Sequence, residues 1–301
     1  MVAPELIHKM LTGDRNALAR LISLVENESE GYHALLAGLI IDRSVPVIGI
    51  TGPPGAGKST LINALLKKMC EKNPSIRLAV LAVDPTSPFN HGALLGDRLR
   101  MNEHYANANI YIRSIATRGA LGGLSAKTLE ITDVLRAANF DYIFIETVGV
   151  GQSEVEVAAL ADTTVVVFVP ESGDEIQTIK SGIMEIADIF VINKSDRDGA
   201  DILLKNIVVT LHERAKSDWD IPVIKTVAQR AEGVDELINS IQQHQQFKHQ
   251  QNKSRLLAEQ AYRIIQRQRM KDVRLEDLQL KLTSALKNKE FNIYKFLEQY
   301  Y

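Results

Sequence analysis

Short apolar runs recur along the chain, separated by stretches with the spacing of amphipathic helices. The runs are rich in β-branched residues and occupy 45–51, 77–83, 109–115, 142–147, 163–169, 189–193 and 222–227. Most are continuously apolar, which is the pattern of strands covered on both faces of a parallel sheet. Helical spacing fills intervening stretches such as 59–71, 126–138 and 202–215. This alternation predicts an α/β fold with a doubly wound, mostly parallel sheet, whose functional loops follow the carboxyl ends of the strands.

The two ends of the chain carry helical patterns without strand patterns. We therefore expect an N-terminal helical segment (1–44), a central domain (45–246) and a C-terminal helical arm (247–301). Residues 248–271 combine an excess of basic side chains with an apolar stripe at Leu257, Ala261, Ile264 and Ile265. Such a stripe packs on the domain or on a second copy of the chain, and a basic face alone is weak support for a nucleic-acid or membrane arm.

The first apolar run leads into the stretch GPPGAGKST at residues 52–60, which fits the pattern G-x-x-x-x-G-K-[ST]. Glycines let backbone N–H groups converge on phosphate oxygens, and the following helix directs its positive end at the anion. Lys58 is expected to neutralise the β and γ phosphates, and the Ser59 hydroxyl to bind Mg²⁺. The strand before it and the helix after it favour a P-loop NTPase over a chance glycine-rich turn. The predicted nucleotide contacts here are Gly52, Pro54, Gly55, Ala56, Gly57, Lys58, Ser59 and Thr60.

The stretch FVINKSD at 190–196 predicts which base the site holds. A carboxylate at Asp196 can accept hydrogen bonds from N1–H and the exocyclic amine of guanine, whereas adenine leaves it unpaired. Lys194 can lay its methylenes on the base, and Asn193 can tie the loop down. Asp196 could instead cap the helix that follows, but the upstream phosphate loop favours guanine, hence GTP and GDP. One strand later, Ala228 is the expected backbone N–H near guanine O6.

Acidic residues at the ends of the apolar runs are candidates to surround the Mg²⁺ ion expected at Ser59. Asp84 ends the second apolar run, and Asp97 lies in the glycine-containing stretch that follows. Glu146 ends the fourth run, with Gly149 three residues later, so the carboxylate can reach the Mg²⁺ shell while the glycine N–H meets the γ-phosphate. Asp84 could also cap a turn before a proline, and Asp97 could be a solvated acid beside two arginines.

The residue after Gly149 is Val150, where many GTPases have the glutamine that orients the attacking water. A valine side chain cannot orient water, and Gln152 is the nearby side chain that could substitute. We therefore expect slow intrinsic hydrolysis that a partner or a second copy of the chain accelerates.

The composition of the chain indicates its cellular compartment and excludes some classes of partner, but it says little about the reaction. The chain has 301 residues, a formal net charge of −2 and a single cysteine, Cys70. A near-neutral charge gives no general attraction to nucleic acid or anionic membranes, and one cysteine cannot form an internal disulfide. The start lacks the apolar core of a signal peptide, and the most apolar stretch is too short to cross a bilayer. We expect a cytoplasmic protein.

In these residues the chain resembles the methylmalonyl-CoA mutase-associated GTPases. Members of this family are G-protein chaperones of B12 enzymes, and some are labelled lysine/arginine/ornithine transport ATPases. The resemblance covers nearly the whole chain. It rests on the segments GPPGAGKST, AVDPTSP, GALLGDRLRM, ATRGALGGL, ETVGVGQSE, GDEIQTIKSGIMEIAD and NKSD. Among these, GVGQSE and GDEIQTIKSG are not general features of GTPases.

The resemblance implies Mg²⁺ ligation through Ser59 with Asp84, Asp97 and Glu146 around the metal. It further implies a homodimer formed through the C-terminal arm, and a mobile loop at 170–180 that responds to the mutase. In that loop Asp174 and Lys180 would be the working residues, with Lys180 as an activating cation. From the residues alone, Lys180 is simply a lysine on a helix surface.

The family's role is to gate delivery of adenosylcobalamin to methylmalonyl-CoA mutase and to help release damaged cofactor, with the mutase and its adenosyltransferase as partners. No D-x-H-x-x-G motif occurs in the sequence, so the partners would hold the cobalamin.

Two other functions stay open. A nickel-type metallochaperone GTPase needs clustered soft or imidazole ligands, whereas Cys70, His91 and His104 are far apart in sequence. A transport-linked nucleotidase or kinase that uses ATP is disfavoured by Asp196 and by the absence of an apolar stretch long enough to span a membrane.

Overall fold

The computed structural model describes residues 2–84, 104, 106–116, 127–147, 153–171, 184–213, 218–248, 258, 261–262, 264–266, 268–270, 272–273, 275–287 and 291–300. The chain forms two compact units, Met1–Gln251 and Asn252–Tyr301. The three N-terminal helices belong to the first unit, together with the strands and the glycine-rich loop.

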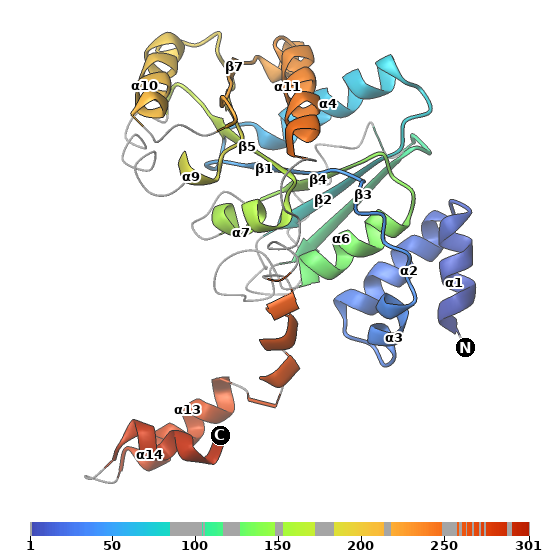
Figure 1. The fold of residues 1–301 in the computed structure, drawn as a ribbon, viewed down its shortest axis with the longest axis vertical. Coiled ribbons are helices and arrows are strands. Elements are labelled where there is room, and N and C mark those ends of the chain that lie inside the picture. The colour runs from blue at the N-terminus through green and yellow to red at the C-terminus, as the bar shows by residue number, and fades with distance from the viewer. Residues whose placement is uncertain are drawn as a thin grey trace. The chain divides into compact units, whose positions relative to one another are not determined.

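A parallel sheet of seven strands forms the centre of the first unit (Figure 1). The strands are β1 (Val47–Thr51), β2 (Leu78–Asp84), β3 (Ile110–Ala116), β4 (Tyr142–Glu146), β5 (Thr163–Phe168), β6 (Ile189–Ile192) and β7 (Val223–Lys225). They lie in the order β3-β2-β4-β1-β5-β6-β7, and every neighbouring pair is parallel. Each of the seven apolar runs is a strand, so the predicted doubly wound α/β fold is confirmed.

The strand order determines where a ligand can be held. β1 lies between β4 and β5. From β1 the chain forms β2, β3 and β4 on one side and then crosses to form β5, β6 and β7 on the other, so the direction of the strand order reverses at β1. In such sheets the crevice at this reversal point, outside the carboxyl ends of the strands, is the usual binding position. The glycine-rich loop follows β1, and Glu146 is the last residue of the neighbouring β4.

Helices cover both faces of the sheet because successive strand residues point to opposite sides. Ile48 and Ile50 of β1 pack with α4 and α11, whereas Val47 packs with α6 and α7 on the other face. A third apolar cluster joins α10 to β5 and β6. Beyond the N-terminal part, the helices that the structure describes in this unit are α4 (Lys58–Lys72), α6 (Lys127–Ala137), α7 (Ser153–Leu160), α9 (Met184–Ile186), α10 (Ala200–His212), η4 (Ala228–Arg230) and α11 (Val234–Lys248).

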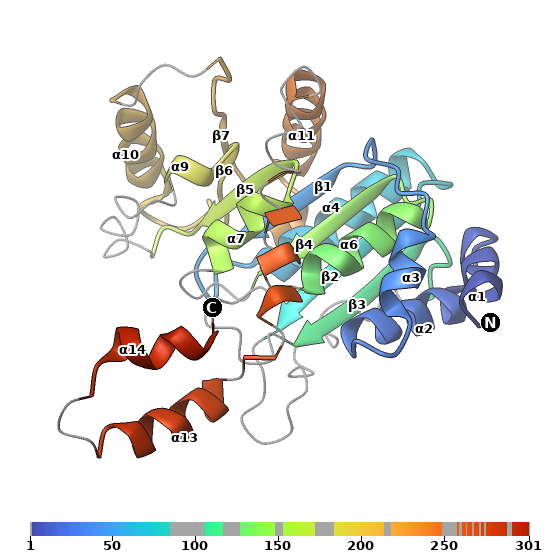
Figure 2. The ribbon, with the colours of Figure 1, turned by 60° about the horizontal axis from the view of Figure 1, so that its bottom comes forward.

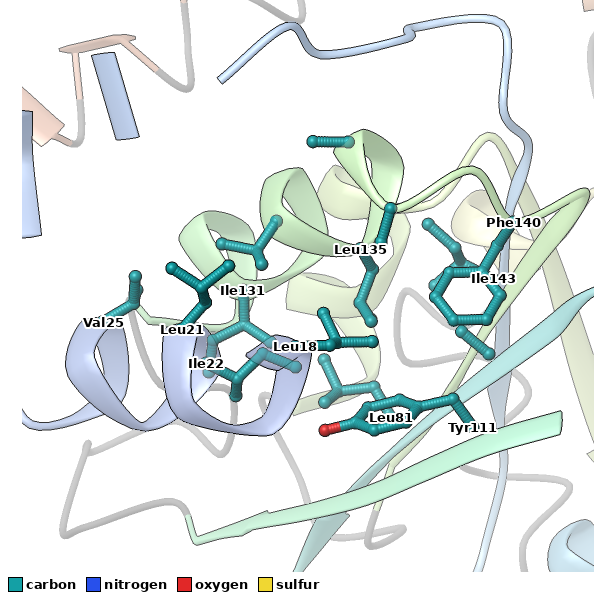
Figure 3. Packing of buried hydrophobic residues seen from close by; sticks show 14 of the residues in the cluster. Leu18, Leu21, Ile22, Val25, Leu81, Tyr111, Ile131, Leu135, Phe140 and Ile143 are labelled. Carbon is teal, nitrogen blue, oxygen red and sulfur yellow. The ribbon is translucent and has the colours of Figure 1, made fainter. Parts of the chain in front are cut away.

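The N-terminal helices are packed onto the edge of the domain beside α6 and β3 (Figure 2). They are α1 (Val2–Leu11), α2 (Arg15–Glu26) and α3 (Tyr32–Ala37). Leu18, Leu21 and Ile22 of α2 meet Ile131 and Leu135 of α6 in a shared core (Figure 3). Burying these side chains contributes about 1.5–3 kcal/mol each, so this segment is part of the folded domain.

The second unit contains α13 (Leu275–Ala285), α14 (Ile293–Leu297) and η5 (Glu298–Tyr300). Asn292 caps α14, since its side chain accepts from the N–H groups of Tyr294 and Lys295. The Lys281 ammonium lies 5.1 Å from the centroid of the Tyr300 ring and 3.1 Å from its hydroxyl oxygen, and this contact joins α13 to η5.

Candidate functional site

The phosphate loop, residues 52–59, leaves β1 and enters α4 through three glycines with positive φ. The φ angles of Gly52, Gly55 and Gly57 are 137°, 77° and 85°, values that other residues rarely adopt. A Cβ on Gly52 would lie 2.1 Å from the carbonyl oxygen of Val167 in β5, so the loop also needs glycine here for space. Gly57 caps α4 without a side chain, which directs the first helical N–H groups into the loop.

Lys58 lies across the mouth of this loop. Its ammonium donates to the carbonyl oxygens of Gly52 at 2.8 Å and Pro53 at 3.0 Å, and the residue is 7% exposed. Pro54 and Gly55 are exposed at the tip, whereas Ala56 is buried beneath it. Thr60 is half-buried in the first turn of α4. The loop thus surrounds a cationic centre with backbone groups, an arrangement suited to a polyphosphate.

Ser59 and Glu146 form the second part of the site. The Ser59 hydroxyl donates to Glu146 Oε1 at 2.7 Å, and both residues are buried. Ala82 of β2 pairs with Glu146, and Asp84 lies two residues further along the same strand, at the same edge of the sheet. A serine hydroxyl and a strand-end carboxylate are hard oxygen donors of the kind that Mg²⁺ prefers. Ser59 and Glu146 therefore fit a magnesium ion.

Asn193 joins the phosphate loop to the base loop, residues 193–196. Its Nδ2 donates to the carbonyl oxygen of Ala56 at 2.9 Å. Its Oδ1 accepts from the Thr226 hydroxyl at 3.2 Å and from the Ala228 N–H at 3.1 Å. All four residues are buried, so this one amide links the ends of β6 and β7 to the loop after β1.

Lys194 makes a second link between the two loops. Its backbone has a φ of +55°, which is uncommon outside glycine, and its ammonium donates to the carbonyl oxygen of Gly55 at 2.8 Å. The side chain therefore extends from the base loop to the tip of the phosphate loop.

Asp196 faces a side chain that sequence reasoning did not single out. Its Oδ2 lies 3.3 Å from Nη1 of Arg230, in the turn η4 after β7. The Arg230 Nε donates to Glu232 Oε1 at 2.7 Å. Glu232 above all, and Asp196 to a smaller extent, raise the pKa of the Arg230 guanidinium. The spacing between Asp196 and Arg230 along the chain offered no signal for this contact.

The structure brings together most of the predicted site residues that it describes. These are Gly52, Pro54, Gly55, Ala56, Gly57, Lys58, Ser59, Thr60, Glu146, Asn193, Lys194, Asp196 and Ala228. Asp84 is described through its backbone alone. The predictions for Asp97, Gly149, Gln152, Asp174 and Lys180 lie outside the described residues.

In the described part of the chain, a cluster of metal ligands would favour the metallochaperone alternative, and a membrane-spanning helix would favour the transport alternative. In these residues no group of three or more His, Cys, Asp or Glu side chains could hold a metal ion. Over the same ranges, no helix has the length and apolar character needed to cross a membrane.

A family model described as the methylmalonyl-CoA mutase-associated GTPase MeaB matches residues 18–282. A Pyrococcus horikoshii protein with a provisional GTPase name is 48% identical over 248 residues, which are 81% of this chain and 78% of that protein. The GTPase ArgK of Escherichia coli is 36% identical over 252 residues, covering 79% of this chain and 74% of ArgK. The mitochondrial methylmalonic aciduria type A homolog of Mus musculus is 38% identical over 262 residues, covering 80% of this chain and 62% of that protein.

Solved structures share the fold. A LAO/AO transport system kinase superposes with a TM-score of 0.66 at 27% identity, covering 99% of this chain and 96% of that one. HypB from Helicobacter pylori, in complex with nickel, superposes with a TM-score of 0.51 at 15% identity, covering 77% of this chain and 98% of HypB. At 15% identity, the similarity to HypB shows a shared fold alone.

Proposed function

The chain belongs to the MeaB family of methylmalonyl-CoA mutase-associated GTPases, and we propose that it is a Mg²⁺-dependent GTPase chaperone of a B12-dependent acyl-CoA mutase. In this role its nucleotide state gates the loading of adenosylcobalamin into methylmalonyl-CoA mutase and protects or reactivates that enzyme. The family model supports the mutase as partner through its description. The mouse relative, whose name refers to methylmalonic aciduria, supports the same metabolic setting.

One observation carries the nucleotide part of the proposal. A single buried amide, Asn193, bonds the phosphate loop at Ala56 and the turn after β7 at Ala228. A triphosphate on the phosphate loop and a base beside Asp196 would therefore occupy one connected site. In it the Asp196 carboxylate accepts the two donors of guanine, Lys194 lies along the ring and Ala228 lies on the O6 side.

The hydrolytic step needs charge neutralisation and an oriented water. Lys58 would neutralise the β and γ phosphates, and Ser59 with Glu146, Asp84 and Asp97 would hold Mg²⁺. When bound, the ion neutralises charge on the phosphate oxygens. Gly149 would donate its N–H to the γ-phosphate.

The rate of hydrolysis would depend on a partner. Because Val150 cannot orient water, we expect slow turnover in the isolated chain. Gln152 is the residue proposed to substitute for the water-orienting glutamine, and Asp174 and Lys180 are the residues proposed to act when the mutase binds. We further propose a homodimer formed through the C-terminal arm, cobalamin held by partner proteins, and the adenosyltransferase as a further partner.

No specific observation favours either alternative function, the transport-linked nucleotidase or kinase and the nickel-type metallochaperone. One similar solved structure is that of a transport system kinase. In this chain Asn193 and Lys194 join the loop that carries Asp196 to the phosphate loop, which supports a guanine site. The likeness to nickel-bound HypB is one of fold at 15% identity. We therefore place both below the GTPase chaperone.

The guanine assignment is tested by measuring the affinities of the chain for GDP and ADP by calorimetry, with the variant Asp196→Asn. The wild type should bind GDP far more tightly than ADP. The variant should lose at least about a hundredfold in GDP affinity, because an asparagine amide carries no charge and places its NH2 group, a donor, against one of the two guanine donors. Asp198→Asn, an exposed acid of the same stretch, is the matched control and should bind as wild type. Comparable binding of ADP and GDP by the wild type would contradict the proposal.

The chaperone role is tested by loading apo-mutase with adenosylcobalamin in the presence of the chain. Cofactor loading should differ between GTP, GDP and a non-hydrolysable GTP analogue. If loading of every B12-dependent acyl-CoA mutase tested is unaffected by the chain and its nucleotide, the chaperone role is wrong.

A further inference from the structure

Arg230 contacts the carboxylate that is proposed to read the base. Its Nη1 lies 3.3 Å from Asp196 Oδ2, although the two residues lie 34 positions apart in sequence. Both side chains keep solvent access, with exposed fractions of 54% for Arg230 and 40% for Asp196. The contact is therefore at the surface of the site, where a ligand can meet the remaining lone pairs of the carboxylate.

A second acid holds Arg230 in place. Glu232 accepts from Arg230 Nε at 2.7 Å and from Nη2 at 3.4 Å, so both of its carboxylate oxygens meet the guanidinium. Two-point contacts of this kind orient the planar guanidinium group. Glu232 is fixed in turn through its backbone, because its carbonyl oxygen accepts from the Val227 N–H at 3.1 Å.

Orientation matters because guanine recognition is planar. An aspartate carboxylate turns through a broad range about its last side-chain bond. Guanine presents N1–H and its exocyclic amine side by side, so both are accepted only when the carboxylate lies in the plane of the base. The two oxygens offer about four lone-pair sites, which allows Oδ2 to accept from Arg230 and still meet the base.

We propose that Arg230 is a specificity-determining positioning residue, which holds the Asp196 carboxylate in the orientation that accepts both donors of guanine, with Glu232 holding Arg230. The inference rests on the proposed guanine site and goes beyond it, because it names a residue that sets the preference for the 2-amino group. Arg230 itself touches Asp196 and not the reacting phosphates.

The chain offers a matched control in Arg197, which follows Asp196 directly. Its guanidinium pairs with Glu171 and not with Asp196, and its exposed fraction is 52%, close to that of Arg230. Replacing Arg197 by alanine removes the same charge from the same neighbourhood while leaving the Asp196–Arg230 contact in place.

The test is calorimetry of the full chain with GDP and with inosine diphosphate, which has N1–H but lacks the exocyclic amine. Arg230→Ala should weaken GDP binding about three- to fivefold, in line with an exposed charged pair, and inosine diphosphate binding less than about twofold. Arg197→Ala should leave both affinities within about twofold of wild type. Arg230→Lys keeps the charge but not the planar fork, so it should recover only part of the GDP affinity.

Glu232 supplies a second measurement. Glu232→Ala should weaken GDP binding less than Arg230→Ala does, and the double variant should bind as Arg230→Ala alone, because Glu232 acts through Arg230. Additive losses would overturn the inference.

Three further outcomes would also overturn it: unchanged GDP binding by Arg230→Ala, tighter binding, or equal losses for GDP and inosine diphosphate. Equal losses would mean that Arg230 only stabilises the turn. Failure of the guanine site itself is recognised separately, since the wild type would then bind ADP as well as GDP.

Discussion

Gly57 stands where the phosphate loop touches the side chain that joins it to the base loop. Its φ is +85°, and a Cβ there would lie 2.5 Å from Asn193 Nδ2, the atom that donates to Ala56. Gly55, two residues earlier, has a similar φ of +77°, but a Cβ there would have no neighbour within 4 Å. An alanine at either position therefore strains the backbone, but only an alanine at Gly57 would also displace the Asn193 side chain.

We expect Gly57→Ala to weaken GDP binding at least about tenfold more than Gly55→Ala. Both variants carry the strain of a left-handed alanine, on the order of 1–2 kcal/mol, but only Gly57→Ala moves Asn193. Calorimetric titration with GDP and urea unfolding of both variants give the comparison. Equal GDP affinities for the two variants would mean that Asn193 does not couple the loops.

At the scale of elements, α11 is fastened to the sheet by a buried histidine near the amino ends of the strands. His244 Nδ1 lies 2.8 Å from the Thr163 hydroxyl at the start of β5, and its Nε2 lies 3.3 Å from Asp188 Oδ1, before β6. The ring packs edge-on against Trp219 at 4.8 Å, and the indole N–H donates to the Asp188 carbonyl oxygen. This cluster lies away from the phosphate loop, at the opposite ends of the strands.

We expect His244→Ala to lower the free energy of unfolding by about 2–4 kcal/mol, since it removes buried hydrogen bonds and leaves a cavity. The fluorescence of Trp219, the single tryptophan, reports the change directly in a urea titration. His212→Ala, an exposed histidine of α10, should cost no more than about 0.5 kcal/mol. A similar effect of both substitutions would show that the cluster does not fasten α11.

At the scale of the whole molecule, the site residues that the structure describes all belong to the first unit, Met1–Gln251. The second unit, Asn252–Tyr301, leaves many large apolar side chains exposed. They are Tyr262, Ile264, Ile265, Met270, Leu280, Leu286, Ile293 and Tyr294. Apolar side chains that form a contiguous exposed patch are typical of an interaction site, and we propose that these side chains face a second copy of the chain.

We therefore expect a chain that ends at residue 251 to bind GDP within about twofold of the full chain, because the binding residues are retained. The full chain should be a dimer by sedimentation velocity, and the shortened chain a monomer. A monomeric full chain, or a dimeric shortened one, would contradict the proposed role of the C-terminal arm.

The fold was predictable because it depends on local patterns. Each apolar run became a strand; the run at 45–51, for example, is β1 at Val47–Thr51. The predicted helix at 59–71 is α4 at Lys58–Lys72, and the glycine spacing between them predicted the phosphate loop. Strand and helix periodicity, and the glycines that a phosphate loop needs, are properties of neighbouring residues, so the sequence alone determines them.

Long-range contacts were decided only by the tertiary structure. Asn193 meets Ala56 across 137 positions, and Ser59 meets Glu146 across 87. The motifs predicted that these residues share a site, but not which atoms bond. The contact between Asp196 and Arg230 had no motif at all, because it depends on the turn after β7 returning beside the base loop. Periodicity describes one element at a time, whereas such contacts depend on the order in which parallel strands are laid side by side.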